Sequence, residues 1–180
     1  MEFVSESDSA RRAGAGRRAV DVADIESVYV RTYPALVRVC AATLEDGEEA
    51  LEAVQEGFAV AIQRRAAFRG EGSLDGWVWR VVVNAARTRQ RRRVGRMKAE
   101  ALVREEPPGV PRDAWSSQEF VRDFVRTLPE RQRLVLFLRY FSGLDYREIA
   151  QVADIAVGTV SATLNAAHES LRRAMEEAED

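Results

Sequence analysis

The sequence predicts an all-α protein in which a flexible linker joins two small helical domains. Over most of the chain, apolar residues recur at spacings of three and four, which is the period of an amphipathic helix. No segment alternates with a period of two for long enough to predict a strand. Three of the five prolines fall within residues 105–112 (EEPPGVPR), which prevents a helix and suits an extended tether. We therefore place the domain boundary there, in a chain of 180 residues.

The composition argues against a metalloprotein, a membrane protein and an enzyme. Cys40 and His168 are the only residues of their types, so they form neither a Cys/His zinc set nor an internal disulfide. Apolar runs such as 134–138 (LVLFL) fall far short of the roughly 20 residues that span a bilayer. No signal peptide, nucleophile–base pair or phosphate-binding glycine loop is evident. We predict a cytoplasmic, non-enzymatic protein with no membrane segment, no metal and no other cofactor.

The first domain is expected over residues 21–97. Residues 1–20 are small, polar and aperiodic, which predicts a disordered arm. The first helix begins near Asp24, and Pro34 should kink or interrupt it. A second amphipathic helix follows from about residue 47 to residue 66. The domain thus starts with two helices that bury one apolar face each.

The third helix is expected from Leu74 to about Met97, with Ser73 as its N-cap after a glycine-containing loop. It begins apolar and ends in arginines. Residues 84–98 hold seven bases and no acid, whereas residues 45–56 hold six acids and no base. Arginine supplies 26 of the 27 bases, and a guanidinium binds phosphate bidentately. The basic block at 84–98 therefore indicates a nucleic-acid contact. The acidic block at 45–56 forms a separate face of opposite charge.

The linker is expected over residues 98–115 and the second domain over 116–180. Helical periodicity resumes at Ser116. Residues 146–171 then show the spacing of a helix-turn-helix, in which one helix, a short turn and a second helix each contribute buried residues. Those residues are Ile149 and Ala150, then Ile155, then Val157, Val160 and Leu164. Two packed core helices with no role in DNA binding are the alternative that this pattern leaves open.

Two sets of motifs resemble the extracytoplasmic-function sigma factors of bacterial RNA polymerase. Region four of that family is resembled by residues 128–133 (LPERQR), 138–150 (LRYFSGLDYREIA) and 157–160 (VGTV). Region two is resembled by residues 53–56 (AVQE) with Phe58, 68–70 (FRG), and 77–80 (WVWR) followed by Asn84. The resemblance covers roughly residues 24–97 and 117–174, in the order of the family. It implies a subunit that binds core polymerase, melts promoter DNA and directs initiation.

The resemblance assigns polymerase binding to Glu52, Gln55 and Glu56, a polar stripe on the second helix. They would dock on the clamp helices of the largest polymerase subunit, with Glu52 in place of the usual Asp. Taken from the sequence alone, the same stripe could be an ordinary solvated face. The apolar surface of the second domain would serve the flap of the second-largest subunit. Glu105 and Glu106 in the linker would mimic the charge of RNA, although a simple tether explains them equally well.

The third helix and the loop before it are expected to contact the minus-ten promoter element. Aromatic faces hold unpaired bases and arginines hold phosphates. By resemblance the 68–73 loop forms the pocket for a flipped base, and we expect Trp77 to be largely structural. Arg89 to Arg93 are expected to contact phosphates. The candidate minus-ten residues are Phe68, Arg69, Trp79, Arg80, Asn84, Arg87 and Arg91.

The helix expected to recognise the minus-35 element departs from the family. Bases near its start are replaced by Ser161, Thr163 and Ala166, and none occurs until Arg172. Residues 116–180 hold 8 bases and 11 acids, so their net charge is −3. Asp154 stands where the turn usually has glycine. We therefore predict weak or atypical minus-35 recognition. The candidate residues are Arg147, Thr159, Ser161, Thr163 and Asn165.

Core RNA polymerase and promoter DNA are the partners that follow, and the resemblance leaves open an anti-sigma factor or an activator. A stand-alone helix-turn-helix regulator is the alternative function. It would explain the C-terminal half, but it would leave the stripe at Gln55 and Glu56 and the tryptophan-rich helix without a purpose. It would also require a more basic recognition helix.

Overall fold

The computed structural model describes residues 19–100 and 123–179, and these residues form helices and connecting turns with no strand among them. The predicted all-α class is confirmed. The expected arm at 1–20 and the proline-containing part of the expected linker lie almost entirely outside the described residues, as does the start of the second domain at Ser116.

The first half contains α2 (Val22–Leu44), α3 (Gly47–Gln63), the 3-10 turn η1 (Arg65–Ala67) and α4 (Leu74–Glu100). Ser73 caps α4 as predicted, since its Oγ accepts a hydrogen bond from the backbone N of Gly76 at 2.9 Å. The second helix ends three residues earlier than expected and continues as the 3-10 turn.

Helix α2 runs through Pro34 without a break. Of the two expected effects of Pro34, a kink or an interruption of the helix, the structure excludes the interruption. Proline removes one N–H donor and leaves the carbonyl of Val30 without its helical partner. Pro34 and Val30 are both exposed, so water is able to bond that carbonyl. The fully buried Leu36, Val39 and Cys40 hold the following turns in place.

The second half contains α6 (Glu130–Phe141), α7 (Tyr146–Ala153) and α8 (Val157–Glu179), preceded by a helical segment at 123–127. Helices α7 and α8 form the predicted helix-turn-helix. Asp154 ends α7 in the left-handed conformation, with φ 57° and ψ 54°, at the place where the sequence suggested a substitute for glycine. Val157 is 47% exposed, so its assignment to the inner face was wrong. It is the first residue of α8, and the inner face begins at Val160.

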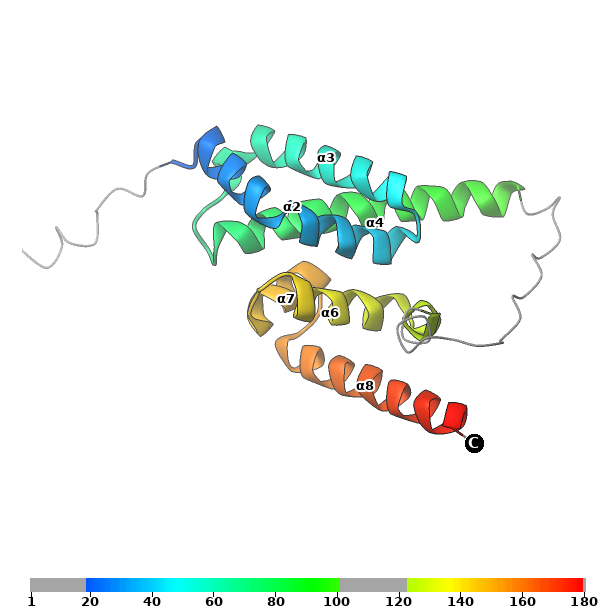
Figure 1. Cartoon of the computed structure of the whole chain (residues 1–180). Coiled ribbons are helices and arrows are strands. Elements are labelled where there is room, and N and C mark those ends of the chain that lie inside the picture. Colours follow the sequence, from blue (N-terminus) through cyan, green and yellow to red (C-terminus); the bar gives the residue numbers. More distant parts are fainter. Residues whose placement is uncertain (1–18, 101–122, 180) are drawn as a thin grey trace, which may run out of the picture.

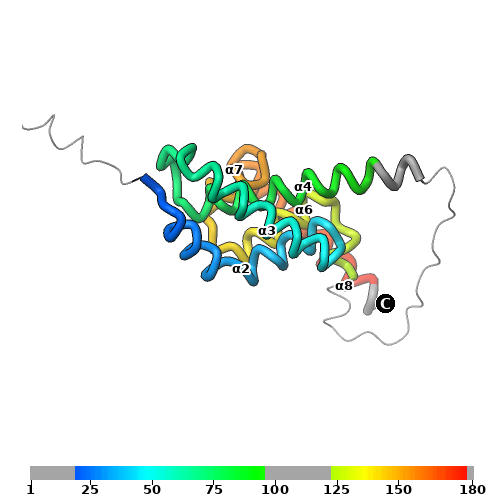
Figure 2. Tube along the Cα trace, turned by 90° about the horizontal axis from the view of Figure 1, so that it is seen from above, coloured from blue at the N-terminus to red at the C-terminus, as the bar shows by residue number. Residues whose placement is uncertain are grey.

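The two halves pack directly on each other. Figure 1 shows α3 on one side of the α2/α4 pair, with α6 and α7 on the other side and α8 outermost. Helix α2 packs against α6, and α4 packs against α7. In the view from above, the second half overlaps the first along most of α2 and α4 (Figure 2).

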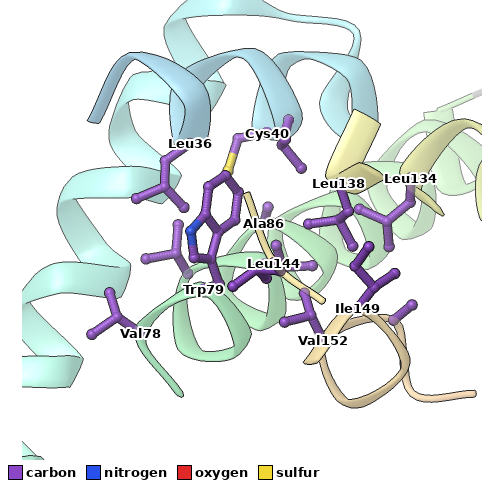
Figure 3. Packing of buried hydrophobic residues seen from close by; sticks show 14 of the residues in the cluster. Leu36, Cys40, Val78, Trp79, Ala86, Leu134, Leu138, Leu144, Ile149 and Val152 are labelled. Atoms are coloured by element: carbon purple, nitrogen blue, oxygen red, sulfur yellow. The ribbon is translucent and has the colours of Figure 1, made fainter. Parts of the chain in front are cut away.

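One continuous cluster of buried apolar side chains runs through both halves. Trp79 of α4 lies against Cys40 of α2, and Leu144, Ile149 and Val152 of the second half pack into the same cluster (Figure 3). Burying this much apolar surface between the halves favours their association, because the driving force grows with the area removed from water. The described halves therefore share a core.

Candidate polymerase and nucleic-acid interfaces

The acidic stripe is formed by Glu49, Glu52 and Glu56, which lie on one face of α3 at spacings of three and four. Arg89 of α4 contacts all three carboxylates. Its Nε donates to Glu49 at 2.8 Å and its Nη1 to Glu56 at 3.2 Å, and its Nη2 donates to Glu52. Partial burial acts to lower the pKa of Arg89, but the hydrogen bonds that Arg89 donates to Glu49 and Glu56 outweigh it and the pKa is raised. The stripe thus has its own counterion.

Arg89 was expected to contact DNA phosphates, but in this structure its guanidinium group is bound by the three carboxylates of α3. The reason is the packing of α3 against α4. Gly57 faces Val82 at the closest approach, and a Cβ added at Gly57 would lie 2.7 Å from the Val82 Cα. Glu49 lies about two turns before Gly57 on α3, and Arg89 lies about two turns after Val82 on α4. Because the two helices are antiparallel, these residues meet. Gly57 and the antiparallel spacing were the signals that could have located the ion pairs.

Of the predicted polymerase-binding residues, Glu52, Gln55 and Glu56 are all exposed. The side chain of Glu52 is 56% exposed and that of Glu56 is 45% exposed, even though both contact Arg89. Leu51 beside them is also exposed, which corrects its expected place in the core. This surface offers carboxylates, an amide and one exposed leucine, and it is suited to a basic partner.

The two tryptophans differ in burial, and both pack in or against the core. Trp79 is 0% exposed at the centre of the shared core, so it has no surface to present to DNA and its assignment as a minus-ten contact is corrected. Trp77 is only partly buried, and its ring lies 5.9 Å from that of Phe68, centroid to centroid. A spacing of two places them on different faces of α4. Which of the faces is buried depends on α2 and the second half.

The remaining α4 candidates share one face but differ in exposure. Arg80, Asn84 and Arg91 are exposed. Arg87, between them, is partly buried and its Nη2 donates to the backbone oxygen of Ala153 in α7 at 2.9 Å. This burial lowers the pKa of Arg87, against the opposing effect of Glu130 and Asp154. The second half therefore engages one member of the predicted minus-ten face.

The loop before α4 is also in contact with the second half. Gly70 and Gly72 adopt positive φ, which turns the chain between the partly buried Phe68 and the cap residue Ser73, with Arg69 exposed. The hydroxyl of Ser73 donates to Glu148 Oε1 of α7. A Cβ added at Gly76 would lie 3.1 Å from the same oxygen. The expected pocket for a flipped base thus borders an acid of the helix-turn-helix.

Arg147, Ser161 and Asn165, three of the predicted minus-35 residues, are exposed. Thr159 is partly buried, and Thr163 lines a cleft of about 670 Å³ together with Arg87 of α4. Both arginines of α8 pair with acids on the same helix. Arg172 contacts Glu169 at 2.6 Å and Glu176 at 2.5 Å, and Arg173 contacts Glu169 at 3.2 Å. The helix therefore presents hydroxyls and an amide, and its cations are matched by its own carboxylates.

No group of three or more potential metal ligands occurs in the part of the chain that the structure describes. Among the same residues, no helix is both long enough and apolar enough to cross a membrane.

Comparison with known proteins identifies the class. The family described as sigma-70 region 2 matches residues 28–96, and the family described as sigma-70 region 4 matches residues 121–175. The chain belongs to the sigma-70 family, the promoter-recognition subunits of RNA polymerase.

Within that family it is an extracytoplasmic-function sigma factor. It is 33% identical to the ECF RNA polymerase sigma-E factor of Escherichia coli K12 over 134 residues, 67% of this chain and 70% of the relative. It is 30% identical to the RNA polymerase sigma-H factor of Pseudomonas aeruginosa over 148 residues, 74% of this chain and 76% of the relative.

Two solved structures have a similar fold. One is the sigma factor RpoE of Bartonella quintana in complex with the anti-sigma factor NepR, with a TM-score of 0.70, 19% identity, and coverage of 85% of this chain and 97% of that one. The other is CnrH in complex with the cytosolic domain of CnrY, with a TM-score of 0.63, 19% identity, and coverage of 93% and 95%.

Proposed function

We propose that this sigma factor binds core polymerase through α3, opens and holds the minus-ten element through α4 and its preceding loop, and recognises the minus-35 element weakly through α8. Residues 21–97 act as region two, 98–115 as the linker and 116–180 as region four. The protein works without catalysis or cofactor in the bacterial cytoplasm. The observation that carries the proposal is the separation of an exposed acidic surface on α3 from an exposed arginine-bearing face on α4.

The polymerase-binding surface consists of Glu52, Gln55 and Glu56, and the proposed partner is the clamp helices of the largest subunit. Exposed carboxylates contribute most to the rate and specificity of association with a basic surface. Arg89 reduces the charge of the stripe in the free chain, because three of its nitrogens contact the carboxylates. The apolar groove of about 870 Å³ that Phe124, Phe137 and Phe141 help to line is the proposed site for the flap of the second-largest subunit.

Promoter DNA is proposed to meet Arg80, Asn84 and Arg91 on α4 and Phe68 and Arg69 in the loop. Exposed guanidinium groups bind phosphates and release counterions, so this binding should depend strongly on salt. Asn84 is suited to the edge of an unpaired base. Arg87 joins this face only when its hydrogen bond to Ala153 is broken.

Weak minus-35 recognition is supported by the charge of α8. Ser161, Thr163 and Asn165 can donate to base edges, but no arginine in the first turns can make a bidentate contact to guanine. Ser161→Ala/Asn165→Ala should therefore reduce promoter affinity only moderately when core polymerase is saturating, and because both side chains are exposed the shared core stays intact. A large loss of affinity would contradict weak recognition.

A run-off transcription assay tests the proposed function. Purified core polymerase is supplied with fragmented DNA from the source organism, with and without this protein. Discrete new transcripts should appear, and they should vanish with Gln55→Ala/Glu56→Ala. The matched control is Glu26→Ala/Gln63→Ala, which removes the same two side-chain types from exposed positions outside the stripe. A stand-alone regulator would instead bind DNA without core polymerase and yield no new transcripts.

An anti-sigma factor is the proposed regulator, because a solved relative of the same fold is in complex with one. Adding the true regulator to the run-off assay should abolish the new transcripts. An activator remains the alternative partner, and adding it would increase the amount of the new transcripts instead.

A further inference from the structure

Arg89 of α4 is the shared partner of three carboxylates on α3. Its Nε donates to Glu49 at 2.8 Å, its Nη1 donates to Glu56 at 3.2 Å, and its Nη2 donates to Glu52. A different nitrogen therefore binds each carboxylate. Because a guanidinium is planar and its donors point in fixed directions, it determines where each carboxylate lies relative to the other two.

The packing of α4 on α3 holds Arg89 itself in place. Gly57 meets Val82 at the closest approach of the two helices, where an added Cβ would lie 2.7 Å from the Val82 Cα. Figure 1 shows the two helices alongside each other. The side chain of Arg89 is 23% exposed and that of Glu49 is 27% exposed, so this pair is largely covered. The guanidinium thus starts from a fixed position on α4 and has a largely covered first partner.

Glu52 and Glu56 extend from this pair towards solvent, because about half of each side chain is exposed. Each of them contacts Arg89 through one oxygen, Oε2. A carboxylate has lone pairs for about four hydrogen bonds. Both groups can therefore remain bound to Arg89 and still accept hydrogen bonds from a partner protein.

Without Arg89 the three carboxylates would repel one another. They lie on one face of α3 at spacings of three and four, where like charges destabilise a helix. The side chains would turn away from each other, and each would have to be ordered again when a partner binds. Holding the carboxylates in the bound arrangement beforehand avoids that entropic cost.

A purely electrostatic role and a positioning role predict opposite effects for this arginine. A basic partner is attracted by negative charge, so removing Arg89 would strengthen binding if the residue only reduced the charge of the stripe. Removing it would weaken binding if its main effect is to order Glu52 and Glu56. The three separate donor contacts and the largely covered pair with Glu49 favour the positioning role.

We propose that Arg89 is a positioning residue for polymerase binding: from the helix that carries the DNA-binding face, it holds the carboxylates of Glu52 and Glu56 in the arrangement that core polymerase binds. The inference rests on the proposed function of the α3 surface and adds to that surface a basic residue from another helix. One arginine of the basic run thus supports the acidic surface instead of contacting DNA.

The affinity of the full chain for core polymerase, measured without DNA by biolayer interferometry, tests this role. Arg89→Gln should weaken binding about tenfold, which lies within the range of coupling between residues of one ion-pair network, and mainly through faster dissociation. Arg64→Gln is the matched control, because Arg64 is an exposed arginine at the C-cap of α3 and its loss changes the net charge equally. This control should leave the affinity nearly unchanged. Binding by Arg89→Gln that is as tight as that of the control, or tighter, would overturn the proposal.

Arg89→Lys separates geometry from charge. Lysine keeps the positive charge, but it is a point charge without the planar fork, so it does not hold three carboxylates in the same arrangement. Its affinity for core polymerase should fall between those of the unaltered chain and Arg89→Gln. An affinity equal to that of the unaltered chain would show that the charge alone is sufficient, and positioning would be refuted.

A double-mutant cycle separates positioning from damage to the fold. Glu52→Gln/Glu56→Gln should weaken polymerase binding, and adding Arg89→Gln to it should weaken binding little further, because the carboxylates that Arg89 positions are already gone. Independent, fully additive losses would show that Arg89 acts through the structure of α4, which would contradict the proposal. Circular dichroism verifies that each variant is folded.

Failure of the unaltered chain to bind core polymerase would contradict the proposed function, as would unchanged binding by Glu52→Gln/Glu56→Gln. The contacts of Arg89 are then still measurable in the free chain by nuclear magnetic resonance. The Nε–H resonance of Arg89, assigned by its loss in Arg89→Lys, should be protected from exchange with water and should lose this protection in Glu49→Gln. An unprotected Nε–H in the unaltered chain would overturn the proposal independently of polymerase.

Discussion

Helix α4 of the first half and helix α8 of the second half use their arginines differently. On α4 they connect helices or stand exposed. Arg89 of α4 reaches three acids of α3, and Arg80 and Arg91 remain on the surface. On α8 of the second half, Arg172 and Arg173 pair with acids of their own helix. Positive charge suited to DNA is therefore concentrated on α4, and α8 depends on hydroxyl and amide groups.

The largest effect is expected at the tryptophan that both halves bury. Trp79→Ala should lower the free energy of unfolding by about 3–5 kcal/mol, because it leaves a large cavity in the shared core. Urea denaturation followed by circular dichroism measures this. The matched control is Trp77→Ala, which should cost much less since that ring is partly exposed. Equal costs would contradict the distinction between the two tryptophans, and two separate transitions would contradict a shared core.

The next effect compares two glycine-to-alanine substitutions, one at a close helix contact in the first half and one in open space in the second. Gly57→Ala should destabilise by about 1–3 kcal/mol, because the new Cβ would meet the Val82 backbone at 2.7 Å and force α3 away from α4. Gly158→Ala on α8 has nothing within 4 Å and should stabilise by up to about 1 kcal/mol through helix propensity. Thermal unfolding of both variants measures the contrast, and a stabilising Gly57→Ala would refute the close approach.

A smaller effect is expected in DNA binding by the polymerase complex. Arg91→Gln should weaken binding and reduce the slope of log affinity against log salt by about 1, since one phosphate contact is lost. Arg89→Gln should leave that slope unchanged, because Arg89 contacts the acidic stripe. A salt titration of promoter binding distinguishes them. Equal slopes for the two variants would show that Arg89 also contacts phosphate.

The elements that the sequence predicted well are those determined by neighbours in the chain. The Ser73 cap, the turn at Asp154 and the buried positions Ile149 and Leu164 follow from local spacing and local hydrogen bonds. The family motifs likewise located both matched regions. The chain could therefore be assigned to its class from sequence.

The errors concern side chains whose surroundings come from distant elements. Periodicity showed that Trp77 and Trp79 occupy different faces, but only the packing of α2 and the second half decides that Trp79 is buried. Arg89 lies within an arginine-rich run, and its partners lie 33 to 40 residues earlier on α3. Arg87 is similar, because its acceptor Ala153 lies 66 residues away. Composition identifies the arginine-rich run at 84–98, but it does not show which of these arginines contact other helices and which are exposed.

The smallest expected effect compares Glu45 and Asp154, the two non-glycine residues in the left-handed conformation among those that the structure describes, one in each half. Asp154→Gly should stabilise by up to about 1 kcal/mol, because glycine adopts φ 57° without the steric cost of a Cβ, partly offset by the greater freedom of the unfolded chain. Glu45→Gly relieves the same cost at φ 58° but removes the partner of the buried Arg133. It should therefore gain less or destabilise, because Arg133 keeps its burial and loses its ion pair. Chemical denaturation of both variants gives the difference. Equal stabilisation would show that the Glu45–Arg133 pair contributes nothing to holding the halves together, and their packing would then depend on the shared apolar core and the α4/α7 contacts alone.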